Sequence, residues 1–275
     1  MKAMRWVKLF FVILILGVLV LGPVSRSYAQ PLPEAKFYGA LYWTFVSGAP
    51  TPDTPIVFYR EGIISYDCAI RWVSSTDPSS FIDASYVATL KLTGGSRPML
   101  DLQGSTHFVG NIAGGDGRIT YYLRTDKKDP YAPDVTVPLL VSSSGHVSVN
   151  NVTYGYSSVS SWFGTPSNPV QDQILSGFTT DTAAHWEGSR TITENVPLGE
   201  TYAILMTVRS FVQAYDNNSA SGEFQAIIDP TVKIDPDWMV DYNGQQVPGT
   251  QLYSVTFSPG FNAVTLPGVL MLLLD

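Results

Sequence analysis

Three histidines, His107, His146 and His185, are the only imidazole side chains of the sequence, and they lie about 40 residues apart. A protein zinc site needs several ligands, which usually include a close pair such as His-x-His or Cys-x-x-Cys. No such pair occurs, and Cys68 is the single cysteine. The sequence therefore gives no support to a preassembled zinc site, although three separated histidines could still converge in a β fold.

Nucleophilic and carboxylate chemistry have no recognisable motif either. The sequence contains no Gly-x-Ser-x-Gly elbow and no phosphate-binding glycine loop of the Walker or dinucleotide type. Carboxylate pairs for glycosidic cleavage could be drawn from Asp181, Glu187, Glu194 and Glu200. The separation that decides such a role is spatial, so the sequence does not select among them. We assign no catalytic residue, and a hydrolase with dispersed residues stays open as a second alternative.

Calcium is the one cofactor that the sequence proposes. Asp216, Asn218 and Glu223 offer hard oxygen donors around one polar segment, and Ca²⁺ favours such ligands. The segment departs from the twelve-residue EF-hand pattern, because Ala220 and Ser221 stand where a ligand and a glycine would fall. A turn rich in Asp and Asn is the alternative explanation of the same residues.

Two tryptophans are candidate glycan ligands. Trp162 is followed by Phe163 and Gly164, and Trp186 lies between His185 and Glu187. Both segments have polar surroundings, and aromatic rings flanked by polar groups on a β-sandwich would suit a carbohydrate-binding face. Packing of the indoles in the core is the alternative, because sandwiches bury large aromatic side chains. An extracellular polysaccharide is the partner that this interpretation implies.

The elements that position these residues are predicted to be strands. Period-2 alternation dominates, as in residues 200–215, where Tyr202, Ile204, Met206 and Val208 share one face. Gly114, Gly115, Asp116 and Gly117 predict a tight turn before a strand over residues 117–125, and residues 169–176 are the best short helical candidate. The frequent glycines and prolines fit many short strands. We expect an all-β fold, an antiparallel β-sandwich that could take the jelly-roll form.

The first 29 residues have the layout of a secretory signal peptide. A basic start precedes an apolar run over residues 10–21, and Ser27 and Ala29 place small residues before a cleavage site at Gln30. We expect three segments: the signal peptide (1–29), the sandwich (30–262) and an apolar tail (263–275). Cleavage removes four basic residues and lowers the net charge from −7 to −11. This acidity disfavours nucleic acid as a partner, and no stable transmembrane anchor is expected after cleavage.

Residues 224–260 carry a family resemblance. They contain Ile-Asp-Pro at 228–230 and again at 234–236, followed by Tyr-Ser-Val-Thr-Phe-Ser-Pro-Gly at 253–260. This stretch resembles the region before the sorting tail of PEP-CTERM proteins, which Gram-negative bacteria export and whose C-terminal signal an exosortase handles. Residues 264–274 are similar to the start of such a signal. Thr265 replaces the first proline of the family motif, the apolar run is short, and Asp275 stands where basic residues would follow.

The resemblance predicts the location of the protein and says little about its molecular function. It makes an exosortase-type enzyme a partner and places the protein in the periplasm, at the cell surface or outside the cell. The tail is either a degenerate sorting signal or a hydrophobic strand that closes the sheet. The leading hypothesis is an exported, non-enzymatic surface or extracellular-matrix protein, with a carbohydrate-binding β-sandwich as its alternative.

Overall fold

The computed structural model describes residues 31–44, 56–61, 66–73, 81–88, 98–107, 112–150, 154–180, 184–213 and 221–259. The predicted signal peptide, its cleavage residues Ala29 and Gln30, and the tail at 263–275 lie outside these ranges. Contacts divide the chain into Met1–Pro31 and Leu32–Asp275, and the strands belong to the second unit. Within the described ranges, no helix has the length and apolar character needed to cross a membrane.

The described residues fold almost entirely into strands. The strands are β1 (Lys36–Thr44), β2 (Ile56–Glu61), β3 (Tyr66–Val73), β4 (Phe81–Ala88), β5 (Leu100–His107), β6 (Ile112–Lys127), β7 (Thr136–Asn150), β8 (Tyr154–Thr165), β9 (Asn168–Thr179), β10 (Ala184–Pro197), β11 (Thr201–Gln213), β12 (Ser221–Ile234), β13 (Met239–Tyr242), β14 (Gln245–Pro248) and β15 (Tyr253–Phe257). A single turn of helix, α2 (Gly249–Leu252), precedes β15.

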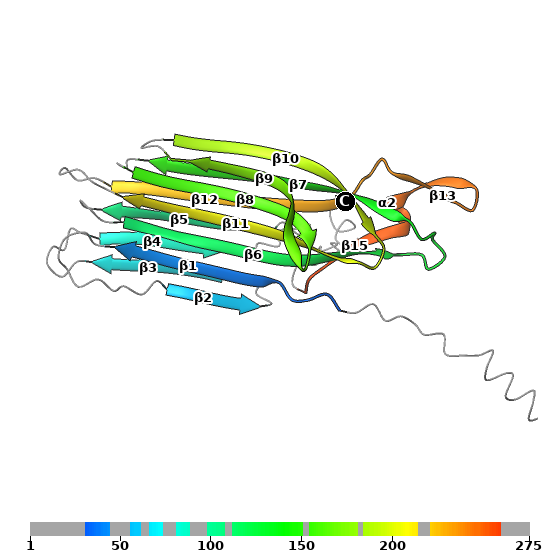
Figure 1. The fold of residues 1–275 in the computed structure, drawn as a ribbon, viewed down its shortest axis with the longest axis horizontal. Coiled ribbons are helices and arrows are strands. Elements are labelled where there is room, and N and C mark those ends of the chain that lie inside the picture. Colours follow the sequence, from blue (N-terminus) through cyan, green and yellow to red (C-terminus); the bar gives the residue numbers. More distant parts are fainter. Residues whose placement is uncertain are drawn as a thin grey trace, which may run out of the picture. The chain divides into compact units, whose positions relative to one another are not determined.

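The strands form two large antiparallel sheets and a hairpin (Figure 1). The first sheet has the order β2-β1-β6-β11-β8-β9, with β15 added beside β6, and the second has the order β10-β7-β12-β5-β4-β3. The hairpin consists of β13 and β14. This architecture confirms the predicted all-β antiparallel sandwich.

Eight consecutive strands, β5 to β12, interlock the two sheets. Four of them are neighbours in the order β6-β11-β8-β9 in the first sheet, and the other four in the order β10-β7-β12-β5 in the second. Two four-stranded sheets joined in this way are the arrangement of a jelly roll. The remaining strands widen the sandwich, since β1 and β2 extend the first sheet beyond β6 and β4 and β3 extend the second beyond β5.

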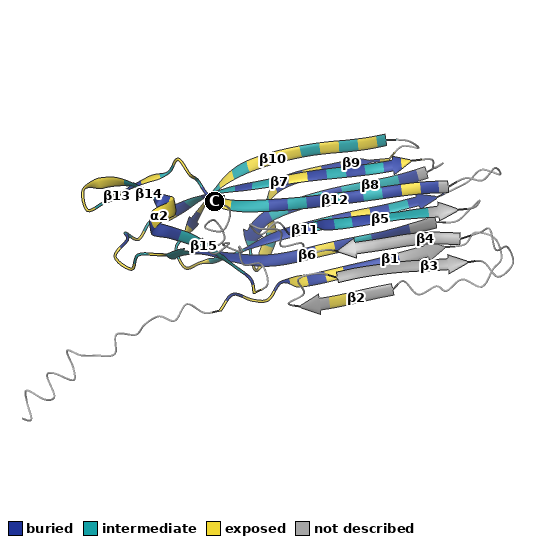
Figure 2. Cartoon of the chain, turned by 180° about the vertical axis from the view of Figure 1, so that it is seen from behind, coloured by how far each residue is buried: buried dark blue, intermediate teal, exposed yellow. Residues whose placement is uncertain are grey.

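Alternation along the strands builds the core between the sheets, as the banding of buried and less buried residues in Figure 2 shows. Ile204, Met206 and Val208 of β11 are buried, as the period-2 pattern predicts. They belong to the same core cluster as three buried residues of β7 in the other sheet, Val137, Leu139 and Val141. Strands β11 and β12, consecutive in the order of the strands, lie in different sheets.

Two local predictions were wrong. Residues 114–117, Gly-Gly-Asp-Gly, lie inside β6 rather than in a turn. A Cβ added to Gly115 would lie 2.9 Å from Leu41 Cδ2 and 3.0 Å from Leu102 Cδ1, so glycine there allows leucines of both sheets to approach the strand. Residues 169–176, the helical candidate, belong to strand β9, which pairs with β8 through two irregularities in register.

Candidate functional site

The outer face of the first sheet carries the most developed candidate site. Because successive side chains of a strand point to opposite faces, the residues between the core positions of β1, β6 and β11 face outward. On β6 the buried Ile119 alternates with the exposed Arg118, and on β1 the buried Phe37 lies between Lys36 and Tyr38. The same alternation that makes the core therefore fixes which side chains form the outer surface.

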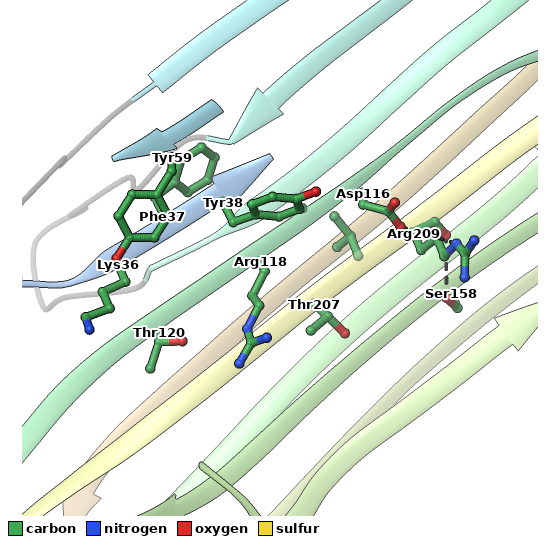
Figure 3. A pocket seen from close by; sticks show the side chains of 12 residues that line it. Lys36, Phe37, Tyr38, Tyr59, Asp116, Arg118, Thr120, Ser158, Thr207 and Arg209 are labelled. Carbon is green, nitrogen blue, oxygen red and sulfur yellow. Dashed lines mark hydrogen bonds and ion pairs between the residues drawn. The ribbon is translucent and has the colours of Figure 1, made fainter. Parts of the chain in front are cut away.

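An open groove of about 610 Å³ runs over this face (Figure 3). One row of residues crosses it in register from Tyr59 of β2 to Tyr38 of β1, Arg118 of β6 and Thr207 of β11. Tyr38 is 38% exposed and Tyr59 is 51% exposed. The groove thus combines two accessible phenol rings with polar side chains along one line.

A second row beside the first contains an ion pair. Asp116 of β6 is in register with Arg209 of β11, which is in register with Ser158 of β8. The Nε of Arg209 lies 3.2 Å from Oδ1 of Asp116, and the Ser158 hydroxyl donates a hydrogen bond to the Arg209 carbonyl at 3.5 Å. Burial raises the pKa of the Asp116 carboxyl, and the charge of Arg209 acts in the opposite direction. The lining of the groove therefore includes a partly exposed ion pair.

Trp162 shares this outer face, at one side of the groove. It lies on β8, in register with Leu205 of β11, and it is half-buried. Its indole Nε1 donates a hydrogen bond to the Ser160 hydroxyl at 3.2 Å, and that hydroxyl lies 2.6 Å from Thr207 Oγ1. Trp162 is thus connected through hydroxyl groups to a residue that lines the groove.

Trp186 occupies a different place. It lies on β10 of the second sheet, half-buried, and packs against the core cluster. A Cβ added to Gly177 of β9 would lie 2.2 Å from two of its indole carbons. The structure therefore places the two candidate tryptophans on different sheets. The side chain of Trp186 fills space between the two sheets.

The candidate calcium ligands are described only in part. Asp216 and Asn218 lie outside the described residues, and Glu223 is an exposed residue of β12. In the described part of the chain, no group of three or more His, Cys, Asp or Glu side chains is arranged to hold a metal ion. The calcium site stays a prediction.

Two of the three histidines meet on the second sheet. The rings of His146 on β7 and His185 on β10 have centroids 6.3 Å apart. His107 lies on β5, and its side chain is not described. Separated histidines do converge in this fold, as a pair.

Acidic side chains also gather where β9 and β10 approach each other. Burial, and then the charge of Asp172 on β9, raise the pKa of Glu194 on β10. The Tyr202 hydroxyl donates a hydrogen bond to Glu200 Oε2 at 3.3 Å. Burial, then the charge and hydrogen bond of Glu200, and last the charge of Glu194 raise the pKa of this phenol. Glu187 lies seven residues before Glu194, on the opposite face of β10, so it does not join them. Asp181 lies outside the described residues.

Glu194→Gln should stabilise the fold at neutral pH. A raised pKa means that ionised Glu194 destabilises the native state, a cost that is absent below the unfolded pKa of about 4.3 and complete above the folded pKa. The melting temperature of the variant should exceed that of the wild type by about 1–2 °C at pH 7 and equal it near pH 3.5. Thermal melts at the two pH values measure this, with Glu187→Gln as the control on the other face. Equal melting temperatures at pH 7 would contradict the expectation.

Sequence reasoning missed the residues of the groove. Tyr38, Tyr59 and Arg118 occur in no motif, and their only signal is that each follows or precedes an apolar residue (Phe37, Phe58 and Ile119) in a strand-like segment. That signal predicts an outward side chain, but it does not say which outward residues lie on neighbouring strands. The pairing of β2 with β1 and of β1 with β6 supplies this information.

No protein-family model and no curated protein matches the chain. Solved structures with some similarity include a β-glucosidase from Kluyveromyces marxianus in complex with glucose, at 10% identity and a TM-score of 0.24, over 73% of this chain and 17% of that one. The enzymatically active domain of bacteriophage CBA120 tailspike protein 4 aligns at 10% identity and a TM-score of 0.20, over 72% of this chain and 19% of that one. A third is CBM28, a carbohydrate-binding module specific for non-crystalline cellulose, at 12% identity and a TM-score of 0.22, over 49% of this chain and 74% of that one.

The chain thus spans less than a fifth of the first two structures. Similarities at these TM-scores carry no argument about function, which must come from the side chains of the site.

Proposed function

We propose that the chain is an exported, non-enzymatic protein that binds carbohydrate in the groove on the outer face of its first sheet. The observation that carries this proposal is the row that places Tyr59 and Tyr38 beside Arg118 and Thr207. A sugar ring presents an apolar face edged by hydroxyl groups. Accessible phenol rings suit that face, and nearby donors and acceptors suit the hydroxyls.

The form of the groove fits a chain ligand better than a small compact one. Its lining residues come from β2, β1, β6, β11 and β8, which are consecutive neighbours in the sheet. With strands about 4.8 Å apart, the lining crosses five strands and about 19 Å, a length that accommodates several sugar rings. An open surface groove of this kind can bind a polysaccharide anywhere along its length.

Export and a surface or matrix location belong to the same proposal. They are supported by the basic start, the apolar run and the small residues Ser27 and Ala29 of the sequence. Analysis of the N-terminus of exported protein would find Gln30 first if cleavage obeys this pattern. An exosortase as partner stays a prediction that depends on the family resemblance alone.

Affinity electrophoresis in native gels that contain polysaccharide tests the binding proposal. The wild type should be retarded by at least one of a panel of neutral and acidic polysaccharides. Replacing both Tyr38 and Tyr59 with alanine should weaken that binding by about tenfold or more, because both ring contacts are lost. Tyr131→Ala is the matched control, since Tyr131 is 86% exposed and lies outside the groove.

Three outcomes would count against the proposal. Failure of every polysaccharide to retard the wild type would contradict the proposed carbohydrate binding. Unchanged retardation of the double tyrosine variant would place binding elsewhere. New reducing ends after prolonged incubation with a bound polysaccharide would favour the alternative of a hydrolase.

A further inference from the structure

Arg118 lies at the centre of the groove. It is exposed on β6, between Tyr38 on one neighbouring strand and Thr207 on the other. Asp116 and Thr120 precede and follow it on the same face of its own strand. Figure 3 shows the Arg118 side chain lying over the sheet between β1 and β11. A ligand that runs along the tyrosine row must therefore pass the guanidinium group.

The charges around Arg118 leave it available for an anionic ligand. Asp116, the nearest carboxylate on its strand, forms its ion pair with Arg209. Within the described part of the chain, no ion pair involves Arg118. Lys36 also lines the groove, but it is in register with Thr120 of β6 and so lies outside the row that contains Arg118, and we assign it no role.

We propose that the groove selects acidic polysaccharides and that Arg118 holds the carboxylate of a uronic acid unit. The inference rests on the proposed function and adds the chemical class of the sugar. A guanidinium group matches a carboxylate through two parallel N–H donors, and this geometry gives the pair both strength and direction.

The net charge of the chain makes a local contact necessary. The full sequence carries −7, and the expected mature chain −11. Such a protein repels a polyanion at long range, so nonspecific attraction does not account for binding. Arg118, in one row with Tyr38 and Tyr59, supplies a local positive charge in the groove where the sugar binds.

Polygalacturonate and its methyl ester form a matched pair of probes, because they share the sugar backbone and differ in the carboxylate charge. The wild type should bind polygalacturonate at least about tenfold more tightly than the ester, and higher ionic strength should weaken only the first interaction. Dextran sulfate serves as a further arm that separates a carboxylate preference from a general preference for anions.

Three variants test whether Arg118 itself binds the carboxylate. Arg118→Gln should lose about tenfold in affinity for polygalacturonate and keep its affinity for the ester. Arg118→Lys should recover only part of the loss, because an ammonium group keeps the charge without the paired donors. Arg190→Gln removes an exposed arginine from β10 of the second sheet and should bind as the wild type does. Circular dichroism melts check that all three variants are folded.

The outcomes separate this inference from the proposed function. Equal affinity for polygalacturonate and its ester, or an Arg118→Gln variant with unchanged affinity, overturns the role of Arg118 and leaves carbohydrate binding in place. Tighter binding of dextran sulfate than of polygalacturonate overturns the carboxylate preference. Absence of binding to any polysaccharide, neutral or acidic, overturns both proposals.

Discussion

Trp186→Ala should lower the melting temperature by about 4–16 °C while leaving polysaccharide binding in the groove unchanged. Truncating a buried tryptophan costs about 3–5 kcal/mol, and the half-buried Trp186 should fall toward the lower end, at about 2–4 kcal/mol. Each kcal/mol shifts the melting temperature of a protein of this size by about 2–4 °C. Thermal melts and affinity electrophoresis of the same variant measure the two effects. Normal stability with lost binding would restore Trp186 as a glycan ligand.

The physical reason is the close fit of the indole among three glycines. An added Cβ would lie 2.2 Å from the indole at Gly177, 2.5 Å at Gly188 and 3.3 Å at Gly145. Gly177 is on β9 of the first sheet, whereas Gly188 and Gly145 are on paired strands of the second sheet. The indole therefore fills space between the two sheets, and these glycines provide the room for it.

The same fit allows a complementary substitution. Gly177→Ala should destabilise the protein as well, because the new methyl group overlaps the indole and displaces it from its place between the sheets. Phe178→Ala is the matched control, since Phe178 is the next residue of β9 and is 64% exposed. Its effect should stay within about 0.5 kcal/mol. A Gly177→Ala variant that melts with the wild type would show that the indole can move without cost.

The architecture could be predicted because it depends on local alternation. Tyr202, Ile204, Met206 and Val208 show a period of two, and the structure has them in strand β11 with the last three in the core. The turn prediction at 114–117 failed for a non-local reason. Gly115 is needed because Leu41 and Leu102 approach β6 closely at this position. The residues next to Gly115 in the sequence do not indicate that approach.

The candidate site could be predicted only as a type of surface. Aromatic residues near polar ones pointed to carbohydrate, but the sequence selected Trp162 and Trp186, the residues of largest ring area. Whether an aromatic side chain of a strand meets water depends on its face and on what covers that face. Tyr38 and Tyr59 are about 20 residues apart in the chain and become neighbours only through the pairing of β1 with β2. Their shared row is a property of register, which single-sequence patterns do not determine.

The segment that carries the family resemblance also has a structural role in this fold. Its first part is strand β12, and its last part is strand β15, which pairs with β6. After β15, the Ser258 N–H donates a hydrogen bond to the Tyr122 carbonyl at 2.8 Å, and the Tyr122 N–H donates to the Ser258 hydroxyl at 2.7 Å. These contacts tie the end of the described chain to strand β6 of the first sheet. Packing thus constrains the sequence of this segment, whether or not a sorting enzyme also recognises the tail at 263–275.

Tyr253→Ala should be among the most destabilising single substitutions in this part of the chain. Tyr253 begins β15 and is fully buried, its ring lies 5.3 Å from that of Trp238 between centroids, and its hydroxyl donates a hydrogen bond to the Pro133 carbonyl at 2.9 Å. Loss of a buried aromatic ring costs about 3–5 kcal/mol, which lowers the melting temperature by about 6–20 °C. Tyr253→Phe is the matched control, because it removes the hydroxyl alone and should cost about 1 kcal/mol. Thermal melts of both variants measure the difference. A Tyr253→Ala variant that melts like Tyr253→Phe would mean that the ring contributes little and that β15 is only loosely held to the sandwich.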